Sequence, residues 1–290
     1  MGIIDKLKYQ WKTGSMLVKL VFINIAVFIL LHLVTLIMMF AGVDAGSVLA
    51  EVELPSSVEA LLRRPWTLVT YMFAQYDLFH ILFNMLWLYW FGVIFLLADT
   101  SKRMLALYIY CGLGGALLFM AYYNAMNMYG LLIGSSASVI GIVTATAIRH
   151  PDYKMGLLFI GEISLKWLAV ITIAIDMFSI GGSNAGGHVA HIGGALTGAL
   201  YAVAQKKGVD ITRPFNALID GIVNLWRYIS TPRKKAAPRK QNAKKAQTTE
   251  SHVADESTLD EILDKVKKSG YGALSKEEKQ KLFDISRKIK

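Results

Sequence analysis

The stretch that decides the fold is residues 104–148, MLALYIYCGLGGALLFMAYYNAMNMYGLLIGSSASVIGIVTATAI, which contain no Asp, Glu, Lys or Arg. A helix that crosses the hydrocarbon core of a bilayer needs about 20 mainly apolar residues, so this stretch is too long for one crossing. Asn124, Asn127 and Gly130 mark the place where the chain turns. The stretch therefore predicts two membrane-spanning helices joined by a short uncharged link.

Four further apolar segments flank this stretch. Residues 20–42 and 78–98 are long enough to cross a bilayer and carry no charged residue, whereas residues 167–180 and 188–204 are shorter. The whole chain is 54% hydrophobic and 18% charged, whereas soluble domains are about 45–50% apolar and about 25% charged. The sequence predicts an all-α protein, a polytopic membrane bundle of six helices.

Positive charge marks one side of the predicted bundle. The lysines and arginines on that side are Lys6, Lys8, Lys12, Lys19, Lys102, Arg103, Arg149, Lys154 and Lys166. The only lysines or arginines in the links on the opposite side, residues 43–77, 124–133 and 181–187, are Arg63 and Arg64. Because positively charged loops stay in the cytoplasm, we expect both termini to be cytoplasmic.

The chain divides into five parts by composition. These are an amphipathic interfacial segment at 1–16, the six-span core at 17–205, an interfacial helix at 206–230, a basic disordered linker at 231–257 and a cytoplasmic helical hairpin at 258–290. Thr258 with Glu261 and Ser275 with Glu278 form capping-box patterns that predict the two helices of the hairpin. We expect the hairpin to dock a cytoplasmic partner. The two interfacial segments, 1–16 and 206–230, could equally be helices that pack on the bundle.

The net charge of +10 describes mainly the tail of the chain. Lys and Arg beside apolar spans are typical of cytoplasmic loops that meet anionic lipid, so membrane lipid is an expected partner. The sequence has no basic and aromatic motif, and nucleic acid is not expected to bind. The single cysteine, Cys111, lies in an apolar run, so neither a disulfide within the chain nor a thiolate metal site is predicted.

Polar residues gather at the outer ends of three predicted spans. His80 and Asn84 lie four residues apart near the start of one span, and residues 134–138, GSSAS, stand where another span begins. His188 and His191 lie at the outer start of the last span. Polar groups are costly inside a membrane, so their alignment at one depth predicts a functional site.

The residue types at this depth favour nucleophilic catalysis. A serine hydroxyl becomes a nucleophile when an adjacent neutral histidine removes its proton. A serine at a helix N-terminus also has free backbone N–H groups beside it, which can hold a transient oxyanion. From the residues alone, Ser135, Ser136 and Ser138 remain alternatives for the nucleophile.

Small residues allow the two spans that carry the serine and the histidine to approach closely. The first has Gly141 and Ala145 on one face, and the second has Gly194, Ala195 and Gly198. Such small-residue spacing is typical of tight helix packing in membranes. We expect these two faces to be in contact.

Three motifs resemble those of one protein family, the rhomboid intramembrane serine proteases of prokaryotic type. Residues 80–85, HILFNM, resemble the family's second-span motif. Residues 134–137, GSSA, with Gly141 resemble its nucleophile motif, and residues 190–194, AHIGG, resemble its last-span histidine motif. The resemblance covers about residues 15–205, with the motifs in the family's order.

The resemblance implies a function and a mechanism. The expected protein is an intramembrane serine endopeptidase that cleaves transmembrane substrate proteins near the outer membrane face through an acyl-enzyme. Ser136 is then the nucleophile and His191 the base, while His80, Asn84 and the amide of Ser136 form the oxyanion hole. The prokaryotic type implies a multi-pass protein of the plasma membrane, the inner membrane of a bacterium.

Three more residues belong to the expected site. Gly134 and Ser135 precede the nucleophile, and His188 is expected to line the oxyanion or substrate region. No cofactor and no metal are expected. A zinc site built from His80, His188 and His191 is disfavoured because the sequence lacks an HExxH motif and no carboxylate is expected at that depth. Asp176 is expected to be hydrogen-bonded within the bundle.

The sequence departs from the family pattern at three places. Ala137 follows the nucleophile where the family usually has Gly. Trp66 is followed by Thr67 rather than Arg, with Arg63 and Arg64 upstream, which leaves open how the first outer loop is braced. Gln75 stands where many members carry another histidine. None of these changes removes the nucleophile or the base.

Two other functions compete with hydrolysis. A non-catalytic rhomboid-like protein would bind and escort membrane clients, but it would not need an intact Ser136 and His191. A small transporter would need polar residues that continue inward, whereas residues 142–148 and 195–204 are nearly apolar. The protease remains the favoured prediction.

Overall fold

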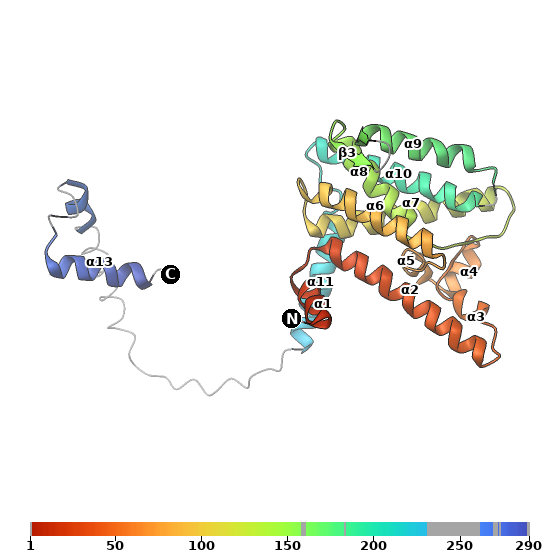
Figure 1. The fold of residues 1–290 in the computed structure, drawn as a ribbon, viewed down its shortest axis with the longest axis horizontal. Coiled ribbons are helices and arrows are strands. Elements are labelled where there is room, and N and C mark those ends of the chain that lie inside the picture. The colour runs from red at the N-terminus through yellow and green to blue at the C-terminus, as the bar shows by residue number, and fades with distance from the viewer. Residues whose placement is uncertain are drawn as a thin grey trace. The chain divides into compact units, whose positions relative to one another are not determined.

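The structure is a computed structural model that describes residues 2–157, 161–182, 184–230, 262–268, 272 and 274–288. The chain separates into two compact units, residues 1–228 and residues 229–290. The first unit is the helical bundle coloured red to cyan in Figure 1. Each unit is described by itself.

Each of the six predicted apolar segments forms a helix in the bundle (Figure 1). They are α2 (Met16–Phe40), α6 (Leu78–Leu96), α7 (Ser101–Ala125), α8 (Ser136–Arg149), α9 (Leu165–Ser179) and α10 (Ala185–Lys206). Within the described residues, α2, α6 and α7 are the helices long and apolar enough to cross a membrane. The chain is therefore a helical membrane protein, and six crossings stay a prediction.

The centre of the bundle is made by α7, α8 and α10, because small residues let their backbones approach. Every residue of α8 from 136 to 147 is buried. A Cβ at Gly194 would overlap the carbonyl oxygen of Ala137, and a Cβ at Gly198 would overlap that of Gly141. The predicted contact between these faces of α8 and α10 is confirmed at these glycines.

We expect Gly198→Ala to destabilise the bundle by about 1–3 kcal/mol, because its methyl group would force α8 and α10 apart. The matched control is Gly221→Ala in a helix, where a Cβ would meet nothing within 4 Å. That control should keep stability or gain about 0.5–1 kcal/mol, since alanine favours helix over glycine. Thermal melting in detergent measures both variants, and equal melting temperatures would contradict the close packing.

A buried carboxylate ties the helices together at the end of the bundle where α6 and α8 end. Asp99 follows α6, and its side chain is 0% exposed. It accepts hydrogen bonds from Arg149 at the end of α8, from Arg103 in the first turn of α7 and from Tyr201 in α10. Two of the basic residues that the sequence predicts on the inner side, Arg103 and Arg149, thus lie together at one end of the bundle.

Asp210, in the loop after α10, extends this network and should make stability depend on pH. Burial raises the pKa of its carboxyl, but hydrogen bonds from Thr212 and from Arg103 outweigh that effect and hold the pKa below its usual value. A depressed pKa in the folded state stabilises the fold above the unfolded pKa of about 3.9. This stabilisation is lost as the pH falls through the folded pKa.

We therefore expect Asp210→Asn to lower the melting temperature at pH 7, and the gap from the wild type to close as the pH falls below 3.9. Melting curves of the two proteins across this range make the test. A gap that stays constant with pH would contradict the role of the Asp210 carboxylate.

The bundle is mostly helical, as the prediction of an all-α protein requires, and it also carries two small antiparallel sheets. β1 (Leu54–Pro55) pairs with β2 (Leu131–Leu132), and β3 (Lys154–Leu157) pairs with β4 (Gly161–Ser164). Two-residue strands have no period that a sequence pattern reveals. The β1 and β2 pair joins the loop between α2 and α6, which the sequence predicts as the first outer loop, to the link that leads into Ser136.

The first outer loop contains α3 (Gly46–Leu49), α4 (Val58–Arg63) and α5 (Thr67–Thr70). Arg64 Nη1 donates to the carbonyl of Ala50 at 2.5 Å, and Trp66 Nε1 donates to that of Glu51 at 2.8 Å. Thr70 Oγ1 donates to the carbonyl of Val52 at 3.0 Å. These bonds answer how the loop is braced without the usual Trp-Arg pair.

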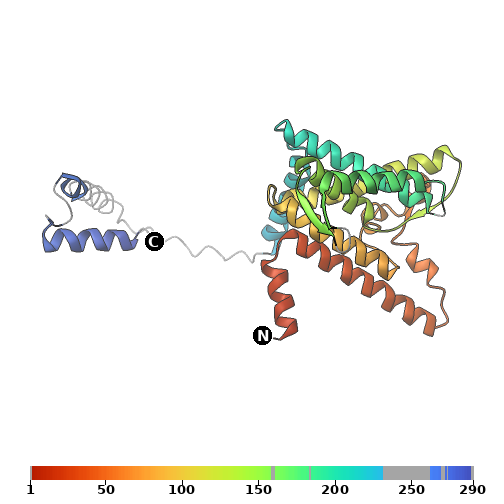
Figure 2. The same cartoon turned by 45° about the horizontal axis from the view of Figure 1, so that its top comes forward.

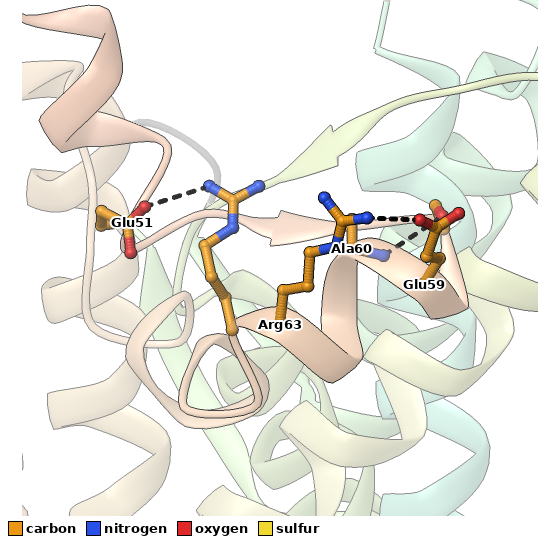
Figure 3. A pocket seen from close by; sticks show the side chains of 6 residues that line it. Glu51, Glu59, Ala60 and Arg63 are labelled. Atoms are coloured by element: carbon orange, nitrogen blue, oxygen red, sulfur yellow. Dashed lines mark hydrogen bonds and ion pairs between the residues drawn. The ribbon is translucent and has the colours of Figure 1, made fainter.

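A depression of about 530 Å³ on this loop is lined by Glu51, Ser57, Glu59, Ala60, Arg63 and Arg64 (Figure 3). Arg63 pairs with Glu59 at 2.6 Å, and Arg64 lies 3.6 Å from Glu51. Both guanidinium groups are thus engaged with carboxylates of the same loop. The depression is part of the brace and offers no free cation for an anionic ligand.

The helices α1 (Ile3–Thr13) and α11 (Arg213–Ser230) leave the bundle at the same end (Figures 1 and 2). The second begins later than the predicted 206–230, because α10 continues to Lys206 and Gly208 then turns the chain with a φ of 75°. Phe215 of α11 contacts the ring of Tyr110 in α7, so part of its apolar face packs on the bundle. Leu218, Ile222 and Trp226 of the same helix are exposed, as an interfacial helix requires.

The second unit contains a helical segment at 262–268 and the helix α13 (Lys276–Lys288). The capping box before α13 is confirmed, since Ser275 N donates to Glu278 Oε2 at 2.7 Å and Glu278 N donates to Ser275 Oγ at 3.2 Å. Lys265 joins the two helices through Glu278 at 2.8 Å. The predicted linker 231–257 and the capping pattern of Thr258 and Glu261 lie outside the described residues.

Candidate active site

A serine and a histidine meet at the end of the bundle where α8 and α10 begin. Ser136 is the first residue of α8, and His191 lies in the second turn of α10. The Oγ of Ser136 is 2.6 Å from Nε2 of His191, which is hydrogen-bonding distance. The two residues that the sequence predicts as nucleophile and base are therefore in direct contact.

A carboxylate completes a line through the histidine. Asp176 lies in the last turn of α9, and its Oδ1 is 2.8 Å from Nδ1 of His191. A proton on Nδ1 that is held by the carboxylate leaves Nε2 free to accept the proton of Ser136. The arrangement Ser136, His191 and Asp176 has the connectivity of a catalytic triad.

The expectation that no carboxylate lies at the depth of His191 is wrong. Asp176 is hydrogen-bonded within the bundle as expected, but its partners are the two histidines of the site. The order of the helices brings the end of α9 to the start of α10, but the sequence does not show which group Asp176 faces there. Asp176 occupies that end of α9.

His188 contacts the same carboxylate oxygen. Its Nδ1 is 2.8 Å from Asp176 Oδ1, and its side chain is 22% exposed. The rings of His188 and His191 lie edge to face, with centroids 5.8 Å apart. The contact that the structure shows for His188 is thus to Asp176, whereas a role toward the oxyanion or substrate stays a prediction.

Gly134 separates His80 from the nucleophile. Its φ is +121°, in the region that favours glycine, and its N–H donates to the carbonyl of Tyr71 at 2.9 Å. A Cβ at this position would lie 3.3 Å from Cε1 of His80 and 3.7 Å from the Oγ of Ser136. The imidazole of His80 and the Ser136 hydroxyl therefore both border the space that a side chain at position 134 would fill.

Backbone amides at the start of α8 add donors to the site. Ser135 is buried at the N-cap of α8, and the first intrahelical bond is donated by Val139. The amides of Ser136 and Ala137 consequently have no intrahelical partner. A Cβ at Gly115 of α7 would lie 2.6 Å from the Cβ of Ala137, so this methyl group points toward α7. Ala137 in place of the usual Gly is accommodated by Gly115.

Asn84 is held by a buried relay of amides. Its Nδ2 donates to Oε1 of Gln75 at 2.7 Å, and Nε2 of Gln75 donates to Oδ1 of Asn24 at 3.3 Å. Nδ2 of Asn24 donates to the hydroxyl of Tyr108 at 3.2 Å, and that hydroxyl donates to the carbonyl of Met72 at 2.8 Å. Gln75 therefore fixes which end of the Asn84 amide is the nitrogen, and that nitrogen carries a second N–H that can act as a donor. The sequence did not indicate Asn24 or Tyr108 as members of the site.

We expect Gln75→Leu to lower kcat about tenfold or more and to leave KM nearly unchanged, because the Asn84 donor loses its orientation. Removing one oxyanion donor outright costs about 10²–10³ in rate. Asn84→Ala and the double variant provide the check in an assay on a membrane-spanning substrate. The double variant should be no slower than Asn84→Ala, and effects that multiply would contradict the relay.

These features define a helical membrane protein in which a serine, a histidine and an aspartate are in hydrogen-bonding contact at one end of the bundle. Residues 62–207, just over half of the chain, match the model of the Rhomboid domain. The chain belongs to the rhomboid family. Residues 242–288 match a second model, a family of unknown function (DUF6576).

Several curated relatives have mitochondrial names. RHOMBOID-like protein 12, mitochondrial, of Arabidopsis thaliana is 30% identical over 158 residues, which are 49% of this chain and 47% of that protein. Presenilin-associated rhomboid-like protein A, mitochondrial, of Danio rerio is 29% identical over 137 residues, 44% of this chain and 34% of that protein. The human Presenilin-associated rhomboid-like protein, mitochondrial, is 23% identical over 164 residues, which are 55% of this chain and 41% of that protein. The match thus spans less than half of each relative.

Proposed function

We propose that this protein is an intramembrane serine endopeptidase that cleaves transmembrane substrate proteins through an acyl-enzyme. The observation that carries the proposal is the 2.6 Å contact between Ser136 Oγ and His191 Nε2, backed by Asp176 on the far side of the ring. Membership of the rhomboid family supports the same reaction class.

The reaction begins with proton transfer. His191 Nε2 takes the hydroxyl proton as Ser136 Oγ bonds to the carbonyl carbon of the scissile peptide, and the carbonyl oxygen becomes negative. Asp176 stabilises the resulting imidazolium through the Nδ1 proton. His191 then gives its proton to the leaving amine as the C–N bond breaks. A water molecule, activated by the same nitrogen, hydrolyses the ester and restores Ser136.

The transient oxyanion needs donors that are already in place. The amide of Ser136, the ring of His80 and the free N–H of Asn84 are assigned this role. They come from the two helices α8 and α6, which pack against each other. Preorganised donors of this kind supply much of the rate enhancement in acyl transfer.

The membrane arrangement follows from where the charges lie. Basic residues and Asp99 mark one end of the bundle, and the Ser136 site marks the other. We assign the basic end and both termini to the cytoplasm, with six crossings and cleavage near the outer face. We assign the protein to the inner membrane of a bacterium. Because the relatives have mitochondrial names, a mitochondrial membrane is the alternative location.

The test is cleavage of a membrane-spanning reporter by the purified full chain in liposomes. We expect one cut near the membrane boundary on the side of the Ser136 site, unaffected by a metal chelator. A protein that binds the reporter but leaves it intact would instead support the non-catalytic function of escorting membrane clients. Protease protection of tags at both termini, in cells, tests the orientation.

A further inference from the structure

Three side chains of the site form a cluster that the hydrolytic reaction does not fully use. Asp176, His188 and His191 each offer one ligand atom, and these atoms lie within 4.8 Å of one another. His188 and His191 are three residues apart on α10 and share a face, while Asp176 comes from α9. The proposed hydrolysis needs one histidine hydrogen-bonded to the Asp176 carboxylate, whereas two histidines contact it in the structure.

The carboxylate has spare capacity to bind. Both histidines contact Oδ1 of Asp176, and its Oδ2 is buried with no hydrogen-bond partner among the described residues. A buried carboxylate oxygen without a partner costs free energy, because the interior offers it no water. A cation beside the two ring nitrogens would remove that cost.

The ligand types select the cation. Two imidazole nitrogens and one carboxylate oxygen suit Zn²⁺, which takes three protein ligands at about 2.0–2.2 Å and leaves a fourth position for water. Mg²⁺ and Ca²⁺ prefer oxygen ligands alone. Ligands around a tetrahedral zinc are about 3.3 Å apart. The nitrogen-to-oxygen distances of 2.8 Å need to widen by about half an ångström, and the two nitrogens, which lie within 4.8 Å of each other, need to reach the same spacing.

We propose that Asp176, His188 and His191 bind Zn²⁺, and that bound zinc turns off the hydrolase. The second part rests on the proposed function. Zinc takes the place of the proton on Nδ1 of each ring, and that proton moves to Nε2, so no proton is released. Nε2 of His191 then has no lone pair free to accept the proton of Ser136. The zinc lies on the side of the His191 ring away from Ser136, so it inhibits and does not act on the substrate.

Binding is tested on the full-length Ser136→Ala protein, in which hydrolysis plays no part. Calorimetric titration with zinc chloride should give one ion per chain, and calcium and magnesium should give no binding. His188→Ala and His188→Gln in the same background should weaken zinc binding at least tenfold, whereas His150→Ala, a histidine outside the cluster, should not. The glutamine keeps a hydrogen-bond donor for Asp176 if alanine unfolds the protein. No stoichiometric binding, or equal affinity in His188→Gln, would overturn the site.

Inhibition is tested on the protein with Ser136 intact. Saturating zinc should abolish cleavage of the reporter, and a chelator should restore it. The His188→Gln protein, measured against its own zinc-free rate, should need at least tenfold more zinc. If zinc binds in the titration and cleavage continues at full rate, the site stands and the switch is refuted. An absence of cleavage in every condition would refute the proposed function and leave the binding result readable.

Discussion

We expect Ser136→Ala to lose cleavage of a membrane-spanning substrate by at least about 10⁴-fold, with the protein still folded. Without the hydroxyl, no acyl-enzyme forms, and the remaining oxyanion donors give only the residual catalysis seen when a serine nucleophile is removed elsewhere. The packing of α8 should tolerate the change, because alanine fits every space that serine fills. Initial rates in liposomes measure the loss, and the melting temperature verifies the fold.

Ser138→Ala is the matched control for this prediction. Ser138 is buried in the same first turns of α8, and its side chain is 1% exposed. The structure pairs Ser136 with His191, so the control should stay within a few-fold of the wild type. Loss of activity in Ser138→Ala with retention in Ser136→Ala would show that the nucleophile has been assigned to the wrong serine.

The second large effect is expected from Asp176→Asn, which should lower kcat by about 10³–10⁴. The amide can present a donor to Nδ1 of His191, which stabilises the tautomer with its proton on Nε2 and prevents that nitrogen from acting as a base. KM should change little, because Asp176 contacts Nδ1 of His191, on the side of the ring away from Ser136. The pH profile of kcat should also change, which loss of a purely structural contact would not produce.

Asp152→Asn controls for the loss of a carboxylate near the membrane. Asp152 is exposed, pairs with Lys166 at 2.7 Å and follows the end of α8 opposite to Ser136. This variant should keep the wild-type rate and pH profile. An Asp176→Asn protein that is folded and cleaves within threefold of the wild type would reduce the site to Ser136 and His191 alone.

The sequence predicted the helices well because the bilayer imposes one requirement on all of them. Residues 20–42 and 78–98 are apolar over the length of a crossing whatever they pack against, and they became α2 and α6. The sheet of β3 and β4 joins four-residue strands that are neighbours in the chain, whereas the sheet of β1 and β2 joins two-residue strands that lie far apart in it, as in the pairing of Leu54 with Leu132. Local sequence carries no signal for such a pairing.

The candidate site, like the fold, could be predicted only where short stretches of local sequence specify it. Ser136 and His191 lie in short local motifs, and position 134 has the glycine that a φ of +121° favours. Asp176 and the Gln75 relay were missed because each gains its meaning from one contact with a residue on another helix. An isolated aspartate in a short apolar segment reads the same whether it faces lipid, backbone or a catalytic histidine.

The most direct measurement is the mass-spectrometric mapping of a fluorophosphonate adduct on the purified full-length protein. The probe reacts with an activated serine, so we expect one adduct per chain, located on Ser136, absent from Ser136→Ala and much slower to form in His191→Ala. Wild-type protein that cleaves its substrate while Ser136 stays unlabelled, or cleavage that survives in Ser136→Ala, would contradict the proposed mechanism.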